Sequence, residues 1–252
     1  MAEFVASPNL PLQAGVVLFG EKYADILEKP LGDWEICAIK VPCNPCVDRR
    51  LSGHGDLSVL HRGGKELILA PYLKGSGFAA SLISRGFELS FADIVQGPEY
   101  PQDAQLNCCV FGENIIAAPG VSDERIVNYF TSGRGCRLIA CKQGYARCSV
   151  CVVDENAVIT ADRGIAAAAE RNGVRVLVIR PGFITLDGYP YGFIGGAAFK
   201  IAKNVLAFTG TLEQHPDKTA ILRFLAERNV DPVYITDYPA FDIGGVLPIM
   251  EK

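Results

Sequence analysis

The sequence predicts an α/β fold, specifically a five-bladed α/β-propeller made of pseudo-fivefold β-β-α-β repeats. Hairpin segments with similar turns recur at intervals of about 40 to 50 residues, and each is followed by an amphipathic helical stretch and a short apolar strand. In addition, the two chain ends each hold part of one further unit. The chain has 252 residues, 49% of them hydrophobic, and we expect one domain over residues 1–252.

Four predicted hairpins define the repeat. Residues 105–119 read as an apolar strand, a Gly-Glu-Asn turn and a second strand, and residues 147–160 repeat this pattern with Asp-Glu-Asn in the turn. Residues 195–208 and 54–71 are further copies, the latter with a longer Arg-Gly-Gly-Lys turn. β-favouring residues on both sides of turn-forming residues are typical of hairpins.

Each hairpin precedes a helix and a closing strand. The predicted helices lie at 76–84, 123–130, 164–171 and 218–227, and the closing strands at 87–91, 137–141, 174–179 and 233–235. Asp123 and Asp162 stand where an acidic residue favours the start of a helix. This order is that of a β-β-α-β unit.

The fifth unit is predicted to combine both chain ends. Residues 242–250 supply an opening strand, and residues 16–19, 23–28 and 34–39 supply a second strand, a helix and a closing strand. Joining these parts would close the ring and remove the sheet edges of an open repeat. The alternative is a generic α/β sandwich, because short apolar runs imitate one another.

Composition argues against several classes of partner. The net charge of −4 is spread over the chain without runs of either sign, so the sequence predicts neither nucleic-acid nor anionic-membrane binding. No stretch is long and apolar enough for a membrane span, and the N-terminus lacks the apolar core of a signal peptide. Nine cysteines are an odd number for disulfides, which favours free thiols in a reducing cytoplasm. No feature indicates a cofactor.

Polar residues are predicted to converge on the centre of the ring. Aligning the repeats on their turns places five positions in register: Asp56, Asn107, Ser149, Ala197 and Asp242. Because side chains alternate along a strand, the expected groups on the inner face are His54 with Asp56, Gln105 with Asn107 and Cys109, and Arg147 with Ser149 and Cys151. Carboxylates, an imidazole, amides and thiols in one cavity would bind a small polar molecule.

His54 is the candidate general acid or base. The pKa of an imidazole lies near neutrality, and Gly53 and Gly55 on either side would let a ligand or another backbone approach closely. The alternative is a histidine that satisfies buried backbone groups. We expect His61 and His215 at the surface, in a turn and beside a proline.

Three cysteines are candidate nucleophiles. Cys108 and Cys109 lie on the unit after that of His54, and Cys148 follows Arg147, a cation that would lower the pKa of its thiol. Each could instead be a buried thiol that packs as a small hydrophobe.

Two further features border the predicted site. Arg147 would bind a substrate carboxylate when the site is occupied and pair with Asp56 or Asp242 when it is empty. The Gly- and Tyr-rich stretch around Tyr189 and Tyr191 reads as a loop at the mouth, where these rings would either wall the pocket or pack within the loop.

Two Cys-x-x-Cys pairs raise the question of a metal. Cys148 and Cys151 lie in a predicted strand, where residues three apart face opposite sides. Cys43 and Cys46 flank a turn, so a labile metal site or a redox pair stays open there. We predict no four-cysteine zinc site and assign no metal ligands.

Two short motifs carry a resemblance to a known superfamily. Gly53-His54-Gly55-Asp56 is similar to the His-x-Asp motif, and Gly195-Gly196-Ala197 to the Glu-Gly-Gly-Asp motif, of the pentein superfamily of guanidino-group modifying enzymes. That superfamily includes arginine and agmatine deiminases, amidinotransferases and dimethylarginine hydrolase. The resemblance covers essentially the whole chain, implies the five-bladed fold and is closest to an uncharacterised bacterial family.

The chain departs from those enzymes at two places. Their nucleophilic cysteine follows a Gly-Gly pair in the last blade, whereas Gly244-Gly245 is followed here by Val-Leu-Pro-Ile. The acid that grips the guanidinium beside their other Gly-Gly pair is absent, since Ile194 precedes and Ala197 follows that pair. The resemblance therefore implies either a hydrolase of amidine, guanidine or amide small molecules with a relocated cysteine, His54 and Asp56, or a non-catalytic small-molecule binder or assembly factor. The second class has a precedent in the superfamily's ribosome-subunit anti-association factor.

Overall fold

Five small mixed sheets, each with its own helix, make up the computed structural model, which describes residues 3–252. Four of these sheets have three strands. In each of the four, the first two strands pair antiparallel and the third pairs parallel to the second. The repeated β-β-α-β unit is therefore present, as the hairpin pattern predicts.

The strands of the four sheets are β4 (Val59–Gly63), β5 (Glu66–Leu69) and β6 (Glu88–Phe91); β7 (Cys109–Phe111), β8 (Asn114–Ala117) and β9 (Arg137–Ala140); β10 (Val150–Asp154), β11 (Ala157–Thr160) and β12 (Arg175–Val178); and β13 (Ala198–Ala202), β14 (Val205–Phe208) and β15 (Asp231–Tyr234). The helices between their second and third strands are α2 (Gly77–Ser84), α3 (Glu124–Asn128), α5 (Arg163–Arg171) and α6 (Lys218–Ala226). The Asp123 side chain accepts from the Arg125 amide and that of Asp162 from the Ile165 amide, so both predicted acids cap their helices.

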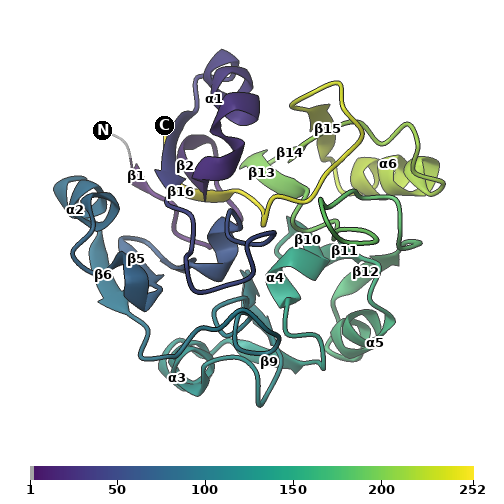
Figure 1. Cartoon of the computed structure of the whole chain (residues 1–252). Coiled ribbons are helices and arrows are strands. Elements are labelled where there is room, and N and C mark those ends of the chain that lie inside the picture. Colours follow the sequence, from purple (N-terminus) through teal and green to yellow (C-terminus); the bar gives the residue numbers. More distant parts are fainter. Residues whose placement is uncertain (1–2) are drawn as a thin grey trace.

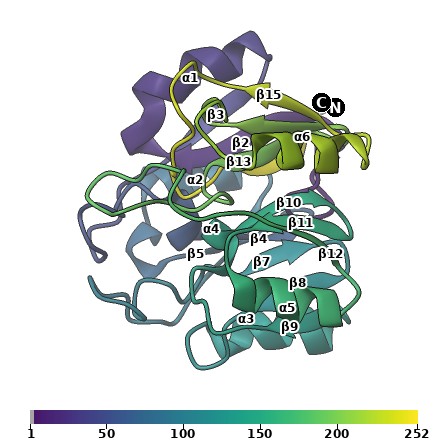
Figure 2. The same ribbon diagram turned by 90° about the vertical axis from the view of Figure 1, so that its right-hand side faces the viewer.

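The fifth sheet joins the two chain ends. Its order is β1 (Glu3–Phe4), β16 (Leu247–Glu251), β2 (Ala14–Gly20) and β3 (Cys37–Val41). β16 pairs antiparallel with β2, which pairs parallel with β3 after the helix α1 (Ala24–Asp33). Figures 1 and 2 show the two termini side by side at this sheet. The split unit is thus found as predicted, and the short strand β1 is an addition that its two residues were too few to signal.

Apolar cores lie between neighbouring sheets. Phe208 of β14 shares one core with Ile159 of β11 and with α6, and Phe19 of β2 shares another with Phe199 of β13 and with α1. In Figure 1 the five units follow one another around a common centre in chain order. Within residues 3–252 no sheet closes on itself, so side-chain packing rather than a continuous hydrogen-bonded ladder joins the units.

The segments nearest the centre differ from the prediction. Gly55–Leu57 form a short 3-10 helix (η2) and Ala146–Ser149 a single helical turn (α4), and β7 begins only at Cys109. The Cys148 amide donates to Asn107 Oδ1 and the Ser149 amide to the Tyr145 carbonyl, so the turn is satisfied without a strand partner. Buried residues give the same apolar signal in a turn and in a strand. The expected strand alternation for His54, Asp56, Gln105, Asn107, Arg147 and Ser149 is therefore wrong.

Smaller differences concern the remaining connections. Three further short elements are η1 (Glu21–Tyr23), η3 (Pro71–Leu73) and η4 (Tyr129–Gly133), the last a π-helical continuation of α3. Within the described residues, no helix combines the length and the apolar character needed to cross a membrane.

Candidate functional site

A cavity of about 280 Å³ lies at the centre of one face of the molecule. Its lining residues are Leu51, His54, Tyr145, Cys148, Leu186, Tyr189, Pro190, Tyr191, Phe193 and Asp242. They come from four loops and from α4, which the surrounding sheets bring together. The cavity therefore combines a few polar groups with an aromatic and aliphatic wall, as small-ligand sites commonly do.

Close approach of two backbones fixes the position of His54. A Cβ atom on Gly20, at the end of β2, would lie 1.7 Å from the Gly53 carbonyl oxygen, and a Cβ on Gly53 would lie 2.7 Å from Lys22 Cβ. Glycine is therefore required at both positions. Gly53 thus allows the close approach of another backbone, one of the two predicted alternatives, whereas a Cβ on Gly55 would have its nearest contact at 3.4 Å.

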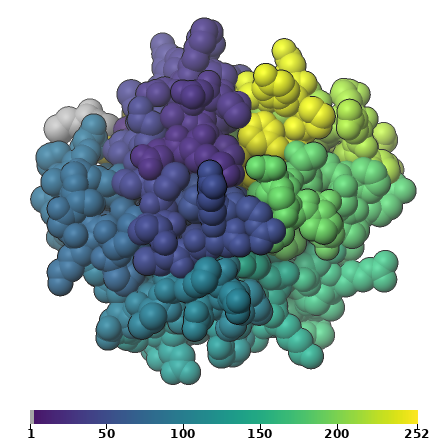
Figure 3. Space-filling view, viewed as in Figure 1, coloured from purple at the N-terminus to yellow at the C-terminus, as the bar shows by residue number. Residues whose placement is uncertain are grey.

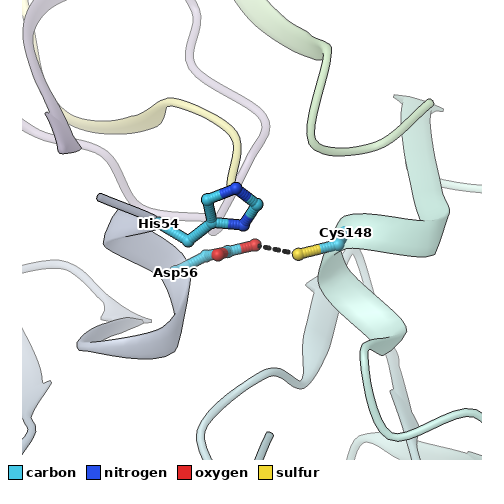
Figure 4. Close-up of side chains that lie close together, drawn as sticks. All are labelled: His54, Asp56 and Cys148. Carbon is cyan, nitrogen blue, oxygen red and sulfur yellow. Dashed lines mark hydrogen bonds between the residues drawn. The ribbon is translucent and has the colours of Figure 1, made fainter. Parts of the chain in front are cut away.

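His54, Asp56 and Cys148 form a compact buried group (Figure 4). The Cys148 Sγ–H donates to Asp56 Oδ2 over 2.9 Å, and one potential ligand atom from each of the three residues lies within 4.8 Å of the others. Figure 4 shows the imidazole lying over the carboxylate, with Cys148 reaching it from α4 on the other side. His54 Nε2 and Asp56 Oδ1 are buried with no hydrogen-bond partner among residues 3–252. Unpaired buried polar atoms cost free energy, so these two are free for a ligand or a proton.

Burial and neighbouring charges keep the thiol protonated. Burial raises the pKa of the Cys148 thiol well above its ordinary value, and Asp56 and Asp242 raise it further, whereas Arg147 lowers it. Arg147 thus lowers the pKa of this thiol as predicted, but burial and the two carboxylates outweigh its effect. Burial also raises the pKa of Asp56, although His54, the Cys148 hydrogen bond and Arg147 lower it.

Asn107 and Asp242 hold the group in place. Asn107 Nδ2 donates to the Asp56 carbonyl and to Cys148 Sγ, both over 3.4 Å. Asp242 Oδ2 accepts from the Phe193 amide and Oδ1 from the Gly244 amide, each over 2.9 Å. Both residues reach the centre as the repeat alignment predicts, and Asp242 lines the cavity itself.

Arg147 faces away from this cavity. Its guanidinium donates to the carbonyls of Gly195 (2.9 Å) and Val246 (3.5 Å) and to Asn9 Oδ1 (3.0 Å). It lines a separate void of about 20 Å³ together with Asn9. No ion pair joins Arg147 to Asp56 or Asp242 in the described chain, so the predicted carboxylate pairing is wrong.

The other predicted residues lie elsewhere. Cys109 packs in the core between β7 and β10, and Cys108 in the core beneath β4 and β8. Burial raises the pKa of both thiols to about 12. Gln105 lies at a surface hollow beside α3, and Ser149 is buried with its hydroxyl unpaired outside the cavity lining. The structure therefore brings only Cys148 of the three candidate cysteines to His54 and Asp56.

Two further predictions on histidines and cysteines are corrected. His61 lies in β4 and His215 near α6, and both are buried, because apolar neighbours enclose them. Cys148 belongs to α4 and only Cys151 to a strand. Cys43 and Cys46 are free thiols, and the described residues form no group of three potential metal ligands around them.

The sequence predicts only some of the residues that form the aromatic wall of the cavity. Tyr189 and Tyr191 line the cavity, as one of the two interpretations of their loop has it. Tyr145 and Phe193, with ring centroids 6.3 Å apart, were missed, although each directly follows a glycine, Gly144 and Gly192. Tyr145 Oη donates to Asp103 Oδ2 over 2.5 Å, which fixes its ring against the pocket.

The three-residue group also has the composition of a metal site. A thiolate, an imidazole and a carboxylate are ligands that Zn²⁺ accepts, and an open fourth position would face the cavity. Because a ligating cysteine must be deprotonated, metal binding would have to displace the proton that Cys148 donates to Asp56.

Comparisons with known proteins agree with this fold. One family model matches residues 19–247, and its description is "Family of unknown function (DUF6873)". A search of curated proteins finds no match to the chain.

Solved structures of guanidino-group modifying enzymes resemble the whole chain. Agmatine deiminase of C. jejuni with substrate bound has a TM-score of 0.58 at 9% identity, over 99% of this chain and 96% of the other. An amidinotransferase of Microseira wollei in the saxitoxin biosynthetic pathway has a TM-score of 0.56 at 9% identity, over 99% and 97%. DDAH of Pseudomonas aeruginosa complexed with citrulline has a TM-score of 0.53 at 10% identity, over 93% and 96%. These matches confirm the resemblance to the pentein superfamily, and at such low identity they establish the fold alone.

Proposed function

The chain belongs to this family of unknown function (DUF6873), and we propose that it is a cysteine-dependent hydrolase that acts on the amidine, guanidine or related amide group of a small molecule. The observation that carries the proposal is the contact between Cys148 Sγ and Asp56 Oδ2, with His54 beside both and a cavity in front of them. We place the enzyme in the cytoplasm, in keeping with nine free cysteines.

The proposal includes the propeller architecture. The cores between successive sheets, including the one that packs β2 against β13, support five blades around a central axis. In such an arrangement the segments before the first strands of the blades meet at the axis, which is where η2 and α4 carry Asp56 and Cys148.

The first step would form a bond between sulfur and the amidine carbon. Asp56 Oδ2 takes the proton of Cys148 as sulfur attacks, and the electron pair of the C=N bond moves to nitrogen. Protonated His54 then donates its proton to the leaving nitrogen, and the C–N bond breaks with release of ammonia or an amine.

The second step would release the enzyme. Water adds to the carbon of the thioimidate and gives a proton to His54, the C–S bond breaks, and Asp56 returns a proton to Cys148. The sum is amidinium plus water giving amide plus ammonium. The same three groups perform both halves of the reaction.

Substrate charge would also help to ionise the thiol. Two carboxylates raise the pKa of Cys148, so a cation placed beside them would offset that effect and favour the thiolate. In the free protein, the raised pKa of Cys148 keeps the thiol protonated, which protects it from alkylation.

The test is to trap the covalent intermediate. We would incubate the protein with agmatine, arginine and benzamidine, measure ammonia release, and map acid-quenched adducts by peptide mass. We expect an adduct on the peptide that carries Cys148, no turnover by Cys148→Ser, and normal turnover by Cys43→Ser. Turnover by Cys148→Ser, or an adduct on Cys108 or Cys109 instead, would contradict the assignment.

A non-catalytic binder is the second candidate. The specific observation in its favour is the high pKa of Cys148, since a protonated thiol is a poor nucleophile. Gly244-Gly245 in this chain is also followed by no thiol. Saturable ligand binding in the absence of turnover and adducts would support this candidate, whereas binding of ribosomal subunits would support an assembly role.

A further inference from the structure

Apart from the imidazole of His54, the ionisable side chains that line the central cavity are acidic groups. Asp242 lines the cavity and Asp56 lies beneath it, both at 2% exposure. No lysine or arginine lines the cavity in the described part of the chain, and neither carboxylate forms an ion pair there. Arg147, whose charge lowers the pKa of Asp56, donates to two carbonyls and to Asn9 rather than to either carboxylate. Buried negative charge without a partner is costly, which favours a ligand that brings a positive charge.

The structure around Asp242 is shaped for this carboxylate. A Cβ on Gly192 would lie 2.5 Å from Asp242 Cβ, and a Cβ on Gly196 would lie 1.8 Å from Asp242 Oδ1. Each oxygen accepts one backbone amide, from Phe193 and from Gly244. A carboxylate oxygen can accept a second hydrogen bond, so both oxygens keep capacity for the N–H groups of a ligand. Asp242 is therefore a fixed acceptor for a planar, two-pronged donor.

Aromatic rings enclose the rest of the space. Tyr145, Tyr189, Tyr191 and Phe193 line the wall, and Tyr191 stands edge-on to Phe193 with centroids 6.3 Å apart. Ring faces attract cations and pack against flat apolar groups. Such a wall is suited to an apolar or aromatic body attached to the cationic head.

The basic residue beside the aromatic wall is engaged by other parts of the chain and does not line the cavity. Arg50 is the basic residue at the rim, where its guanidinium stacks 4.4 Å from the Tyr189 ring centroid. Each of its three nitrogens already donates one hydrogen bond, to Asp48 at 2.8 to 2.9 Å or to the Gly188 carbonyl at 3.0 Å. In Figure 3 the dark blue segment around residue 50 and the green segment around residue 190 meet near the middle of this face. Arg50 thus ties the loop that precedes His54 to the loop that carries Tyr189.

We infer that the cavity selects a planar amidinium or guanidinium cation on an apolar body that carries no carboxylate. This rests on the proposed function in that it places the reactive carbon beside Cys148. Asp242 would bind the N–H edge of the cation, and the aromatic wall would hold the body. Free amino acids would be disfavoured, because their carboxylate would meet apolar rings and two buried acids.

Binding to Cys148→Ser tests this without turnover. We would measure affinity by titration calorimetry for benzamidine, for benzamide as its neutral counterpart, and for 4-carboxybenzamidine as its carboxylate-bearing counterpart. We expect benzamidine to bind at least tenfold more tightly than either, and agmatine more tightly than arginine. Equal affinity for benzamidine and 4-carboxybenzamidine, or for benzamidine and benzamide, would overturn the inference.

Two acid variants locate the cation. In the same background, Asp242→Asn should weaken benzamidine at least tenfold and leave benzamide unchanged, whereas Asp187→Asn, an exposed acid in the loop that carries Tyr189, should change neither. Wild-type benzamidine affinity in Asp242→Asn would contradict the assigned cation site. If Asp242→Asn fails to fold, the ligand series on Cys148→Ser still decides. Selective binding of benzamidine without ammonia release or adducts would contradict the proposed hydrolase but support the inferred ligand selectivity. Turnover of arginine in preference to benzamidine would support the hydrolase but contradict the inferred selectivity.

Discussion

Arg147 and Cys148 are neighbours in α4, yet they serve opposite sides of the protein's centre. Arg147 is buried against Asn9 and two backbone carbonyls, and each of these contacts is a hydrogen bond. Cys148 opens onto the cavity, in contact with Asp56 and close to His54, where two buried polar atoms have no partner. The guanidinium of Arg147 is therefore hydrogen-bonded within the protein, whereas polar atoms beside Cys148 have no partner.

The difference separates a structural role from a functional one. Paired polar groups stabilise a unique arrangement, whereas unpaired buried groups reduce stability and persist where a ligand or a reaction uses them. Both residues are polar, buried and central, so residue type and burial alone would not distinguish them. Their hydrogen-bond partners do, and the four predictions below test whether that distinction is sound.

The largest expected effect is on stability. Arg147→Met would leave the Gly195 and Val246 carbonyls and Asn9 Oδ1 without their donors, and we expect the free energy of unfolding to fall by about 3 kcal/mol or more. Urea denaturation measures it. Arg50→Met is the matched control, because that side chain is half exposed and should matter little. Equal losses of unfolding free energy in Arg147→Met and Arg50→Met would show that the hydrogen bonds of Arg147 have no special structural role.

The second prediction concerns thiol reactivity on the open side. Burial raises the pKa of Cys148 most and Asp56 next, so Asp56→Asn should lower that pKa and speed alkylation at neutral pH several-fold. Iodoacetamide labelling followed by peptide mass measures it, with the exposed Cys37 as internal reference. Asp217→Asn, which removes an acid outside the cavity lining, should leave the rate unchanged. An unchanged rate in Asp56→Asn would mean that access rather than charge controls this thiol.

The repeat could be predicted from the sequence because it depends on local patterns. Alternating hairpins, helix starts at Asp123 and Asp162, and the division of one unit between the chain ends all leave a signal within a few residues. The same reasoning brought His54, Asp56, Asn107 and Asp242 to the centre, since equivalent positions of a repeat meet there.

The direction in which central side chains point could not be predicted in this way. A buried helical turn and a buried strand have the same apolar composition, so the turn at Ala146–Ser149 was taken for a strand and Arg147 was assigned to the ligand. Asn9 and Val246, which occupy Arg147, are far from it in sequence. Partners supplied by distant segments leave no local pattern, and the same holds for the contact of Tyr145 with the pocket.

The third prediction is a pH dependence with a defined sign. Burial raises the pKa of Asp56, so the folded state binds this proton more tightly than the unfolded state. The resulting stabilisation is present below the unfolded pKa, near 3.9, and is lost as pH rises through the folded value. Asp56→Asn should therefore be more stable than the wild type at pH 7, with a smaller difference near pH 4.

Asp217 provides a control of opposite sign. Its hydrogen bond to Arg180 lowers its pKa, so Asp217→Asn should lose stability at pH 7 relative to pH 4. Urea denaturation of both variants at the two pH values measures the two differences. A wild type more stable than Asp56→Asn at neutral pH would place Asp56 among the structural residues with Arg147.

The smallest expected effect is that of Cys148→Ser on stability. The hydroxyl can still donate to Asp56 and accept from Asn107, so we expect the free energy of unfolding to change by less than about 1 kcal/mol. Denaturation beside Arg147→Met measures it in the same series. If Cys148→Ser were as damaging as Arg147→Met, both sides of α4 would be structural, and the unpaired atoms of His54 and Asp56 would need an explanation other than a ligand. A small change would instead mean that the fold does not require this thiol, as a chemical role predicts.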